Sequence, residues 1–351
     1  MRAGLLFVFS ILAPAAWAEP YLAVRSGMNC GACHTNSSGG GQRTAFGNLY
    51  LQNELAARPA DDAQAWSGTV LERFSIGADS RFSARQFEID DRDDNLEFGV
   101  DRVSLYLGAN LNDTVSFYLD QQVAPGASLN REAWAKLTGN SWYLKAGRMF
   151  LALGWRLEDD SAFVREVTGI NRTRGDDGLE IGYESDNFTF QLAATNGNGG
   201  AGENDDGKLF TVRAEFIQPR WRAGLSGAHN STDFAERSIY GAFAGLKTGR
   251  IVWLAEYDYI EDKADGLAEV DQGVALLEAN IQLRKGHNLK ITGEAHTFDD
   301  STEDRHRASL VYEYFPWAFT QLRIGLRSRD SDASEAALNG EEAFVQLHVL
   351  F

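Results

Sequence analysis

Two cysteines and a histidine stand close together near the start of the chain, in the stretch CGACH. Cys30, Cys33 and His34 have the spacing C-x-x-C-H, and the chain contains 2 cysteines in total. This spacing lets both thiols form thioether bonds to the vinyl groups of a haem, while the adjacent histidine ligates its iron. The motif therefore predicts one covalent haem c, with Cys30 and Cys33 as attachment residues and His34 as an axial ligand.

Two other kinds of site use a similar arrangement of ligands. A redox-active C-x-x-C disulfide is typical of a thioredoxin-like βαβ pattern, which this sequence lacks. A structural zinc ion normally takes four protein ligands, whereas Cys30, Cys33 and His34 supply three, with no nearby fourth. The spacing therefore favours haem c over both alternatives.

A second protein ligand on the opposite face of a haem sets its potential and blocks the binding of small molecules. His348 and Met149 are the candidates for this sixth ligand, since each falls on the polar side of a predicted strand. Met28 lies only two residues before Cys30, too close in the sequence to reach the far face. A ligand from the N-terminal segment, or no sixth protein ligand at all, is the alternative.

The haem motif follows a predicted secretion signal at residues 1–18. Arg2 supplies its positive end, LLFVFSILA its apolar run, and Ala16-Trp17-Ala18 its cleavage site. The apolar run of about ten residues falls short of the about twenty that a membrane helix needs. The net charge of −17 becomes −18 without Arg2, which argues against binding to nucleic acid. The mature chain is expected to begin near Glu19, outside the cytoplasm.

Residues 19–66 are predicted to form a haem-binding segment and linker. A segment of this size is too small to bury a haem by itself. After a flexible turn, NSSGGG, the stretch QRTAFGNLYLQNELAA has a helical pattern, with Leu49, Leu51 and Leu55 available to cover the ring. We expect residues 67–351 to supply the missing shelter.

Residues 67–351 show repeated alternation of apolar and polar side chains, which is typical of β-strands. In the last stretch, EEAFVQLHVLF, every second residue from Ala343 to the terminal Phe351 is apolar. A charged side chain that faces lipid costs about 2–4 kcal/mol near the membrane midplane, so the charged side of each strand is expected to face a wet interior. The predicted interior charges are Lys145, Arg213, Lys290, Arg323 and Arg327.

The connections between these strands alternate between short and long. Short turns such as NLND, TGNS, QPRW and KTGR alternate with long, mostly acidic segments such as IDDRDDN, LEDDSAFVREVTGINRTRGDDG, NSTDFAER and EDKADGLAEVD. Short turns at one end and long loops at the other are typical of outer-membrane barrels, with the short turns in the periplasm. The chain is therefore predicted to be all-β, a transmembrane antiparallel β-barrel of about 16 strands in the bacterial outer membrane.

Two local features refine this prediction. Trp142, Trp221 and Trp253 follow short turns and Trp317 lies within one, which indicates an aromatic girdle at the periplasmic interface. The polar phase changes near Asp101–Val103, which indicates a β-bulge. The first strand, TVLERFSIGA, has no clear phase.

The long loops carry clusters of carboxylates. The clusters are Asp90, Asp91, Asp93 and Asp94; Glu203, Asp205 and Asp206; and Asp299, Asp300, Glu303 and Asp304. Carboxylates suit hard divalent cations, so these loops are candidates to concentrate ferrous iron, or they form a hydrated surface.

A secretion signal, one early C-x-x-C-H, a short helical linker with Phe46-Gly47 and a porin-like barrel together resemble the fused monohaem cytochrome–porins of bacterial outer membranes. The best-known members are iron oxidases. The resemblance implies one haem c on Cys30, Cys33 and His34, an extracellular donor such as ferrous iron, and a periplasmic electron carrier as partner. The direction of electron flow is left open, so an extracellular acceptor is the alternative to a donor.

Three functions fit the sequence. The first is an electron conduit across the outer membrane, and it is favoured because a solute pore has no need of a redox centre. The second is a passive diffusion porin whose haem is structural or sensory, which the interior charges keep open. The third is a scaffold barrel that docks multihaem partners.

Overall fold

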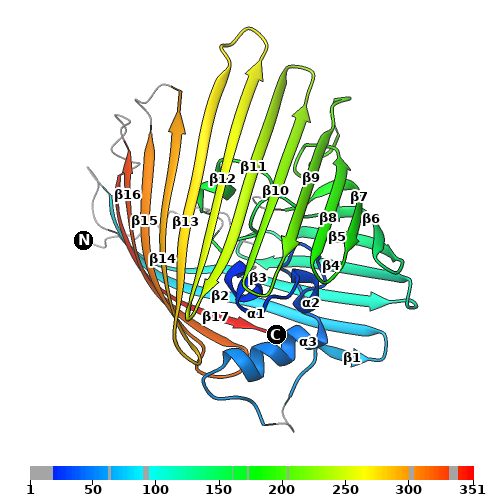
Figure 1. Ribbon diagram of the computed structural model, residues 1–351, viewed down its shortest axis with the longest axis vertical. Coiled ribbons are helices and arrows are strands. Elements are labelled where there is room, and N and C mark those ends of the chain that lie inside the picture. Colours follow the sequence, from blue (N-terminus) through cyan, green and yellow to red (C-terminus); the bar gives the residue numbers. More distant parts are fainter. Residues whose placement is uncertain are drawn as a thin grey trace, which may run out of the picture.

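The computed structural model is a closed sheet of long strands, with short helices at one end (Figure 1). It describes residues 19–61, 65–89, 95–159, 161–171, 174–203, 205–299, 304–331 and 339–351. The helices are α1 (Pro20–Ser26), α2 (Cys30–Cys33), α3 (Ala45–Tyr50), the π-helical turn η1 (Leu51–Leu55) and α4 (Phe163–Glu166). Among the described residues, no helix is long and apolar enough to cross a bilayer.

The strands are β1 (Thr69–Leu71), β2 (Phe74–Ile89), β3 (Asn95–Asn110), β4 (Val115–Ala124), β5 (Leu129–Thr138), β6 (Trp142–Met149), β7 (Asp176–Glu184), β8 (Phe188–Thr195), β9 (Leu209–Ile217), β10 (Trp221–Ser231), β11 (Ala235–Thr248), β12 (Ile251–Ala264), β13 (Val270–Arg284), β14 (His287–Phe298), β15 (Arg305–Tyr314), β16 (Thr320–Ser331) and β17 (Gly340–Leu350).

Strands β2 to β17 form a closed antiparallel barrel of 16 strands, which confirms the predicted fold class. The sheet closes where β17 pairs with β2, from Gly340 opposite Ile89 to Leu350 opposite Asp79. The stretch TVLERFSIGA, which had no clear phase, contains two strands, because the three-residue β1 turns back to pair with the start of β2. Closure leaves no unpaired strand edge, as a sheet within lipid requires.

The predicted alternation matches the two faces of the wall. On β17 the outward Val345 is 50% exposed, whereas the inward His348 is 2% exposed. The predicted interior charges, from Lys145 to Arg327, are all buried on the inner face. The predicted bulge is also present, since Arg81 and Phe82 of β2 pair with Arg102 and Val100 of β3 and leave Asp101 without a partner in the ladder.

Short turns lie at one end of the barrel and longer connections at the other, as expected. The tryptophans predicted for the girdle are exposed near the short-turn end. Two predicted long loops are wrong in extent, because β10 runs to Ser231, β11 starts at Ala235 and β12 runs to Ala264. Residues at both ends of NSTDFAER therefore belong to β10 and β11, and residues at both ends of EDKADGLAEVD belong to β12 and β13. Of the acidic clusters, residues 90–94 and 300–303 lie outside the described residues.

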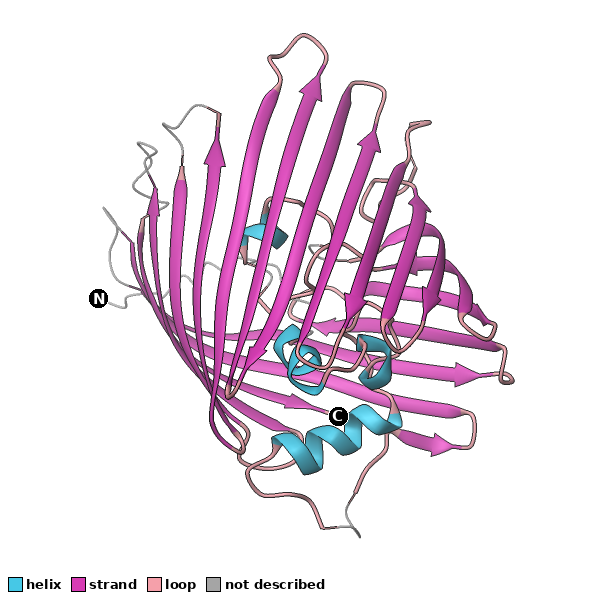
Figure 2. Ribbon diagram, in the orientation of Figure 1, coloured by secondary structure: helices cyan, strands magenta, loops and turns pink. Residues whose placement is uncertain are grey.

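The interior is filled by protein near the short-turn end, where residues 19–66 were expected to pack in or under the mouth of the barrel. Helices α1 and α2 lie inside the wall, and α3 runs beneath it (Figure 2). Inward polar side chains at this level are almost without exposure, as Glu132 at 0%, Arg222 at 1% and Gln321 at 2% illustrate. The N-terminal segment therefore forms a plug whose polar groups are matched to those of the wall.

The plug is bound to the wall by specific polar contacts. Lys290 Nζ on β14 lies 2.8 Å from Glu19 Oε2. Tyr21 donates a hydrogen bond to Glu313 at 3.1 Å. Lys247 donates to the backbone oxygen of Arg25 at 2.8 Å.

A second filling element is the connection between β6 and β7, residues 150–175, here termed the inward loop. It was expected to be one of the long extracellular loops, but it folds back into the barrel. Trp155, Leu157, Phe163 and Val164 are buried in the interior core. Helix α4 packs against β12, β13 and β14.

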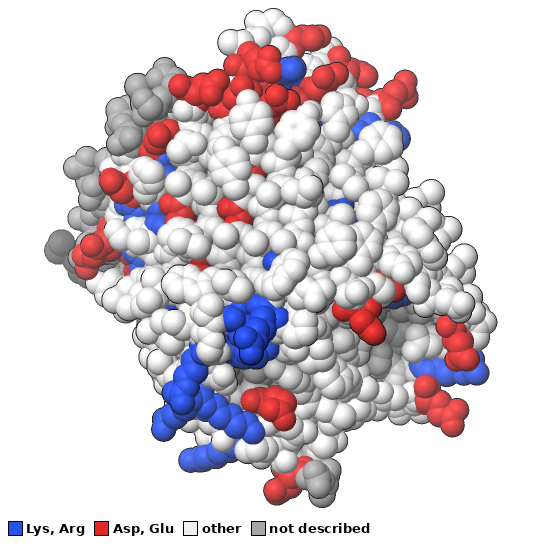
Figure 3. All heavy atoms as spheres, in the orientation of Figure 1, with Lys and Arg blue, Asp and Glu red and all other residues white. Residues whose placement is uncertain are grey.

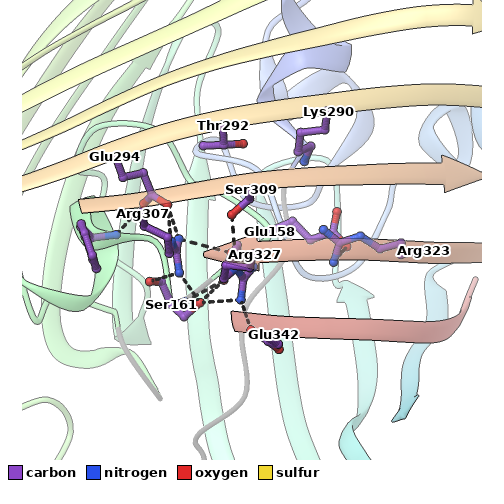
Figure 4. Close-up of polar contacts among 12 residues, drawn as sticks. Glu158, Ser161, Lys290, Thr292, Glu294, Arg307, Ser309, Arg323, Arg327 and Glu342 are labelled. Carbon is purple, nitrogen blue, oxygen red and sulfur yellow. Dashed lines mark hydrogen bonds and ion pairs between the residues drawn. The ribbon is translucent and has the colours of Figure 1, made fainter. Parts of the chain in front are cut away.

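The inward loop is fastened by charged contacts to the inner wall (Figure 4). Asp159 Oδ2 lies 2.5 Å from the Arg327 guanidinium and 3.4 Å from that of Arg307. Glu158 Oε1 lies 3.0 Å from Arg323. The backbone amide of Phe163 donates to Glu294 at 2.8 Å. Because Arg307, Arg323 and Arg327 are buried, loss of an acidic partner would leave a buried positive charge with less compensation.

We expect Gly245→Val to loosen the plug. An added Cβ at Gly245 on β11 would lie 2.5 Å from Val24 Cγ2 of α1, with Leu254 and Trp155 within 3.4 Å. Overpacking of this kind costs about 1–3 kcal/mol. Limited proteolysis should cut the N-terminal segment of the variant faster than that of the wild type. The matched control is Gly293→Val, where an added Cβ meets nothing within 4 Å. Equal cleavage of both variants would show that α1 does not depend on this contact.

We expect the docking of the inward loop to weaken as pH rises. Burial raises the pKa of Glu158, with Glu313 and Asp159 adding to the effect, although Arg323 and Lys290 oppose it. A carboxyl whose folded pKa is raised retains its proton in the folded state after the unfolded state has lost it, so stability falls as pH rises above the unfolded value of about 4.3. The protection factors of the amides in residues 161–171, which correct the exchange rates for their intrinsic rise with pH, should therefore be lower at about pH 9 than at about pH 5, and Glu158→Gln should flatten this profile. An unchanged profile in that variant would contradict the assignment.

Candidate functional site

The C-x-x-C-H motif lies in the plug and forms the short helix α2. Asn29 caps its start, since the Asn29 side chain accepts a hydrogen bond from Ala32 N at 2.8 Å. The His34 amide closes its end by donating to Cys30 O at 3.0 Å. One helical turn brings the two cysteines to the same side, because residues at i and i+3 share a face. Both thiols are free, and Cys30, Cys33 and His34 all line one cavity.

The loop after His34 is built tightly, whereas NSSGGG was expected to be flexible. His34 and Arg43 pair as an antiparallel bridge. The Asn36 side chain donates to Glu132 of β5 at 2.7 Å, and the Gln42 amide donates to the Tyr118 hydroxyl of β4 at 3.0 Å. Gly39, Gly40 and Gly41 have φ of 87°, 72° and 66°, a region that favours glycine. The barrel wall therefore fixes the backbone that carries His34.

Helix α3 supports the motif from the other side through Phe46-Gly47. Thr44 caps α3 by accepting from Gly47 N at 3.1 Å, and its hydroxyl donates to Ala32 O at 2.8 Å. An added Cβ at Gly47 would lie 2.1 Å from Cys33 O, so only glycine permits this approach. The predicted helix is thus present, and Leu51 and Leu55 line the cavity as expected, while Leu49 is exposed.

The cavity lies between the plug, the inward loop and the wall, and its empty space, including the part open to solvent, is about 1000 Å³. Its apolar lining is drawn from Pro20, Leu22, Ala23, Met28, Leu51, Leu55, Trp155, Phe315 and Leu350. Its polar lining includes His34 and His348, three cations, Arg43, Arg156 and Arg213, and two carboxylates, Glu19 and Glu158. A flat apolar group with acidic substituents fits such a lining.

The electrostatics of the cavity favour neutral donors on the motif. Burial, together with the charges of Arg43 and Arg156, lowers the pKa of His34 to about 3. The imidazole is therefore neutral at neutral pH, which is the form that ligates iron. Burial also raises the pKa of both cysteine thiols.

The structure places the two sixth-ligand candidates differently. His348 lines the cavity, with Nδ1 2.8 Å from Gln321 Oε1 and Nε2 3.2 Å from Asp79 Oδ2. Met149 lies fully buried at the end of β6 in the interior core and is not among the residues that line the cavity. The structure therefore brings His348, but not Met149, to the cavity that Cys30, Cys33 and His34 share.

Several cavity residues were missed by the sequence analysis. Trp155, Arg156 and Glu158 come from the inward loop, and Arg43 follows the glycine turn. The apolar stretch FLALGW after β6 is unusual for an extracellular loop and was the available signal for the first three. The zinc alternative gains no ligand, since the described groups of carboxylates, histidines and cysteines close enough to share a metal ion do not include Cys30, Cys33 or His34.

No family model matches the sequence, and no curated protein matches it. Among solved structures, the chain is similar to OmpT of Vibrio cholerae, with a TM-score of 0.63 and 12% identity over 81% of this chain and 99% of that one. It is similar to an anion-selective porin from Comamonas acidovorans, with a TM-score of 0.63 and 12% identity over 79% and 99%. The channel DcaP of Acinetobacter baumannii aligns with a TM-score of 0.59 and 13% identity over 79% and 97%.

These similarities concern the barrel fold. The chain shares with these porins a closed antiparallel barrel, and its outer face is apolar, as a barrel in a membrane requires.

Proposed function

We propose that the cavity holds one haem c, attached through Cys30 and Cys33 and ligated by His34, and that the barrel carries electrons across the outer membrane. The observation that supports this most is that all three motif residues line one large, mainly apolar cavity inside a membrane barrel. When bound, the haem supplies a one-electron redox centre. The chain supplies a neutral imidazole, an apolar lining and cations.

The cations suit the propionate groups of a haem. Arg43 lines the cavity and lies beside His34 through their backbone bridge. Arg156 lies across the cavity, where it donates to Gly39 O and lies 3.7 Å from Glu132. Hydrogen bonds from guanidinium groups to carboxylates are stronger than neutral ones, so these residues would orient the bound group.

Ferrous iron outside the cell is the donor that we propose, which makes the protein an extracellular iron oxidase. The extracellular end is strongly acidic (Figure 3). Glu261, Glu269 and Asp271 have carboxylate oxygens within 4.8 Å of one another at that end. Such a surface raises the local concentration of divalent cations. The partner on the other side is a periplasmic electron carrier.

The alternative is a passive diffusion porin whose haem is structural or sensory. It is favoured by the solved structures that share the fold, one of which is an anion-selective porin. The plug argues for the conduit, since the inward side chains at its level are buried by protein and not by water. Solute flux and electron transfer can be measured on the same preparation.

We expect Cys30→Ala with Cys33→Ala to abolish covalent haem and electron transfer. Liposomes that enclose an oxidised dye and carry the wild-type protein should reduce the dye when an external reductant is added, and the double variant should not. Haem staining of denatured protein checks attachment. Swelling with neutral sugars should be slow for the wild type, because the plug fills the passage.

Fast swelling together with reduction that does not depend on the cysteines would favour the porin. Wild-type protein that carries no covalent haem would end the proposal.

We also propose His348 as the sixth ligand. Ligating histidines usually donate their second ring N–H to an acceptor. In His348 this donor would be Nδ1, which lies against Gln321 Oε1. Nε2 would then be free to ligate the iron in place of its contact with Asp79. His348→Phe should change the absorption spectrum from low-spin to high-spin. Met149→Leu is the matched control and should leave the spectrum unchanged. A low-spin spectrum in the His348 variant would assign the ligand elsewhere.

A further inference from the structure

The short-turn end of the barrel carries an uneven charge. Arg220 lies in the β9–β10 turn, Arg250 in the β11–β12 turn, and Arg284 and Lys285 at the β13–β14 turn. Arg58 in the linker joins them, because Ala57 lies against Gly286 of that last turn. All five side chains are exposed, and none of them forms an ion pair with another residue in the described part of the chain. These five residues are termed the basic rim.

The basic rim is confined to one sector of the mouth. Its three turns join consecutive hairpins, and strands lie about 4.8 Å apart, so the rim spans roughly 20 Å. On other sectors, the β3–β4 and β7–β8 turns carry the exposed acids Asp113 and Asp186. Figure 3 shows basic side chains gathered at the lower end of this face, opposite the acidic extracellular end.

The basic rim also borders the cavity. Gly27, which ends α1 at a φ of 70°, packs against Pro219 of the β9–β10 turn, beside Arg220. Ser26 is exposed and lines the cavity. Lys247, at the start of the β11–β12 turn, holds the backbone of Arg25. The rim is therefore joined to the wall of the cavity through the end of α1.

We propose that the basic rim is the docking surface for an acidic, soluble periplasmic electron carrier, an inference that rests on the proposed function. Charge complementarity identifies the partner, since a positive patch raises the encounter rate of an acidic protein and orients its approach. A lipid headgroup contact would call for basic residues around the whole mouth, whereas the β3–β4 and β7–β8 turns carry Asp113 and Asp186, and the exposed Arg73 of the β1–β2 turn follows the exposed Glu72. The patch thus directs the carrier to the side where the cavity reaches the surface.

The test uses the full protein in nanodiscs of zwitterionic lipid, with an acidic plastocyanin and a basic cytochrome c, both oxidised and of high potential, as probe acceptors. Stopped-flow absorbance follows electron transfer from the reduced protein. The variant is Arg220→Glu, Arg250→Glu and Lys285→Glu. The matched control reverses three exposed charges at the other end, Lys208→Glu, Lys263→Glu and Arg329→Glu.

At low salt, the rim variant should lower the rate with plastocyanin by about tenfold or more and raise it with the cytochrome, whereas the control should stay near wild type. The difference should disappear at high salt, because exposed charges are then screened. Equal rates for the two variants would overturn the proposal. Loss of binding to anionic vesicles without a change in the rate would also overturn it and assign the rim to lipid.

Binding of plastocyanin to the barrel with Cys30→Ala and Cys33→Ala separates this inference from the proposed function. Salt-sensitive binding that is lost in the rim variant supports the docking surface even where no haem is attached. Absence of such binding overturns the docking surface, while a haem that still accepts external electrons leaves the conduit intact.

Discussion

The structure depends on one constraint: a closed ring of sixteen strands surrounds an interior lined with charges, and these charges need water or protein partners. Near the short-turn end this protein provides protein partners. Lys290 meets Glu19 of the plug, and Arg327 meets Asp159 of the inward loop. The same charges that keep the inner face out of lipid therefore hold the filling elements in place. Removal of either element would expose buried pairs on the wall.

This arrangement explains how a short C-x-x-C-H segment acquires a sheltered site. Fewer than fifty residues enclose little volume by themselves, but the wall contributes His348, Gln321 and Phe315 to the cavity, and the inward loop contributes Trp155 and Arg156. The backbone beside His34 is tied to Tyr118 and Glu132 of the wall through Gln42 and Asn36. The cavity is thus a product of barrel and plug together. A haem in it would be enclosed in a way that an open porin lumen does not offer.

Much of this architecture was predictable because its signals are local. Alternation with a period of two follows from the geometry of a strand in a wall with unlike faces, so strand existence, inward charges and the bulge at Asp101 could be read directly. Loop extents were less predictable. NSTDFAER is polar like a loop, yet it pairs across β10 and β11 because hydrogen bonding between long strands overrides local composition.

Spacing between near neighbours was enough to predict a haem motif at Cys30, Cys33 and His34 and to predict the class of fold, of which the structure confirms the second. Only the tertiary structure decided where the inward loop goes, that His348 reaches the cavity while Met149 does not, and that Gly245 and Gly47 are points of close packing. These properties depend on contacts between residues far apart in the chain. No periodicity encodes such contacts, because they form only when the barrel has closed around its plug.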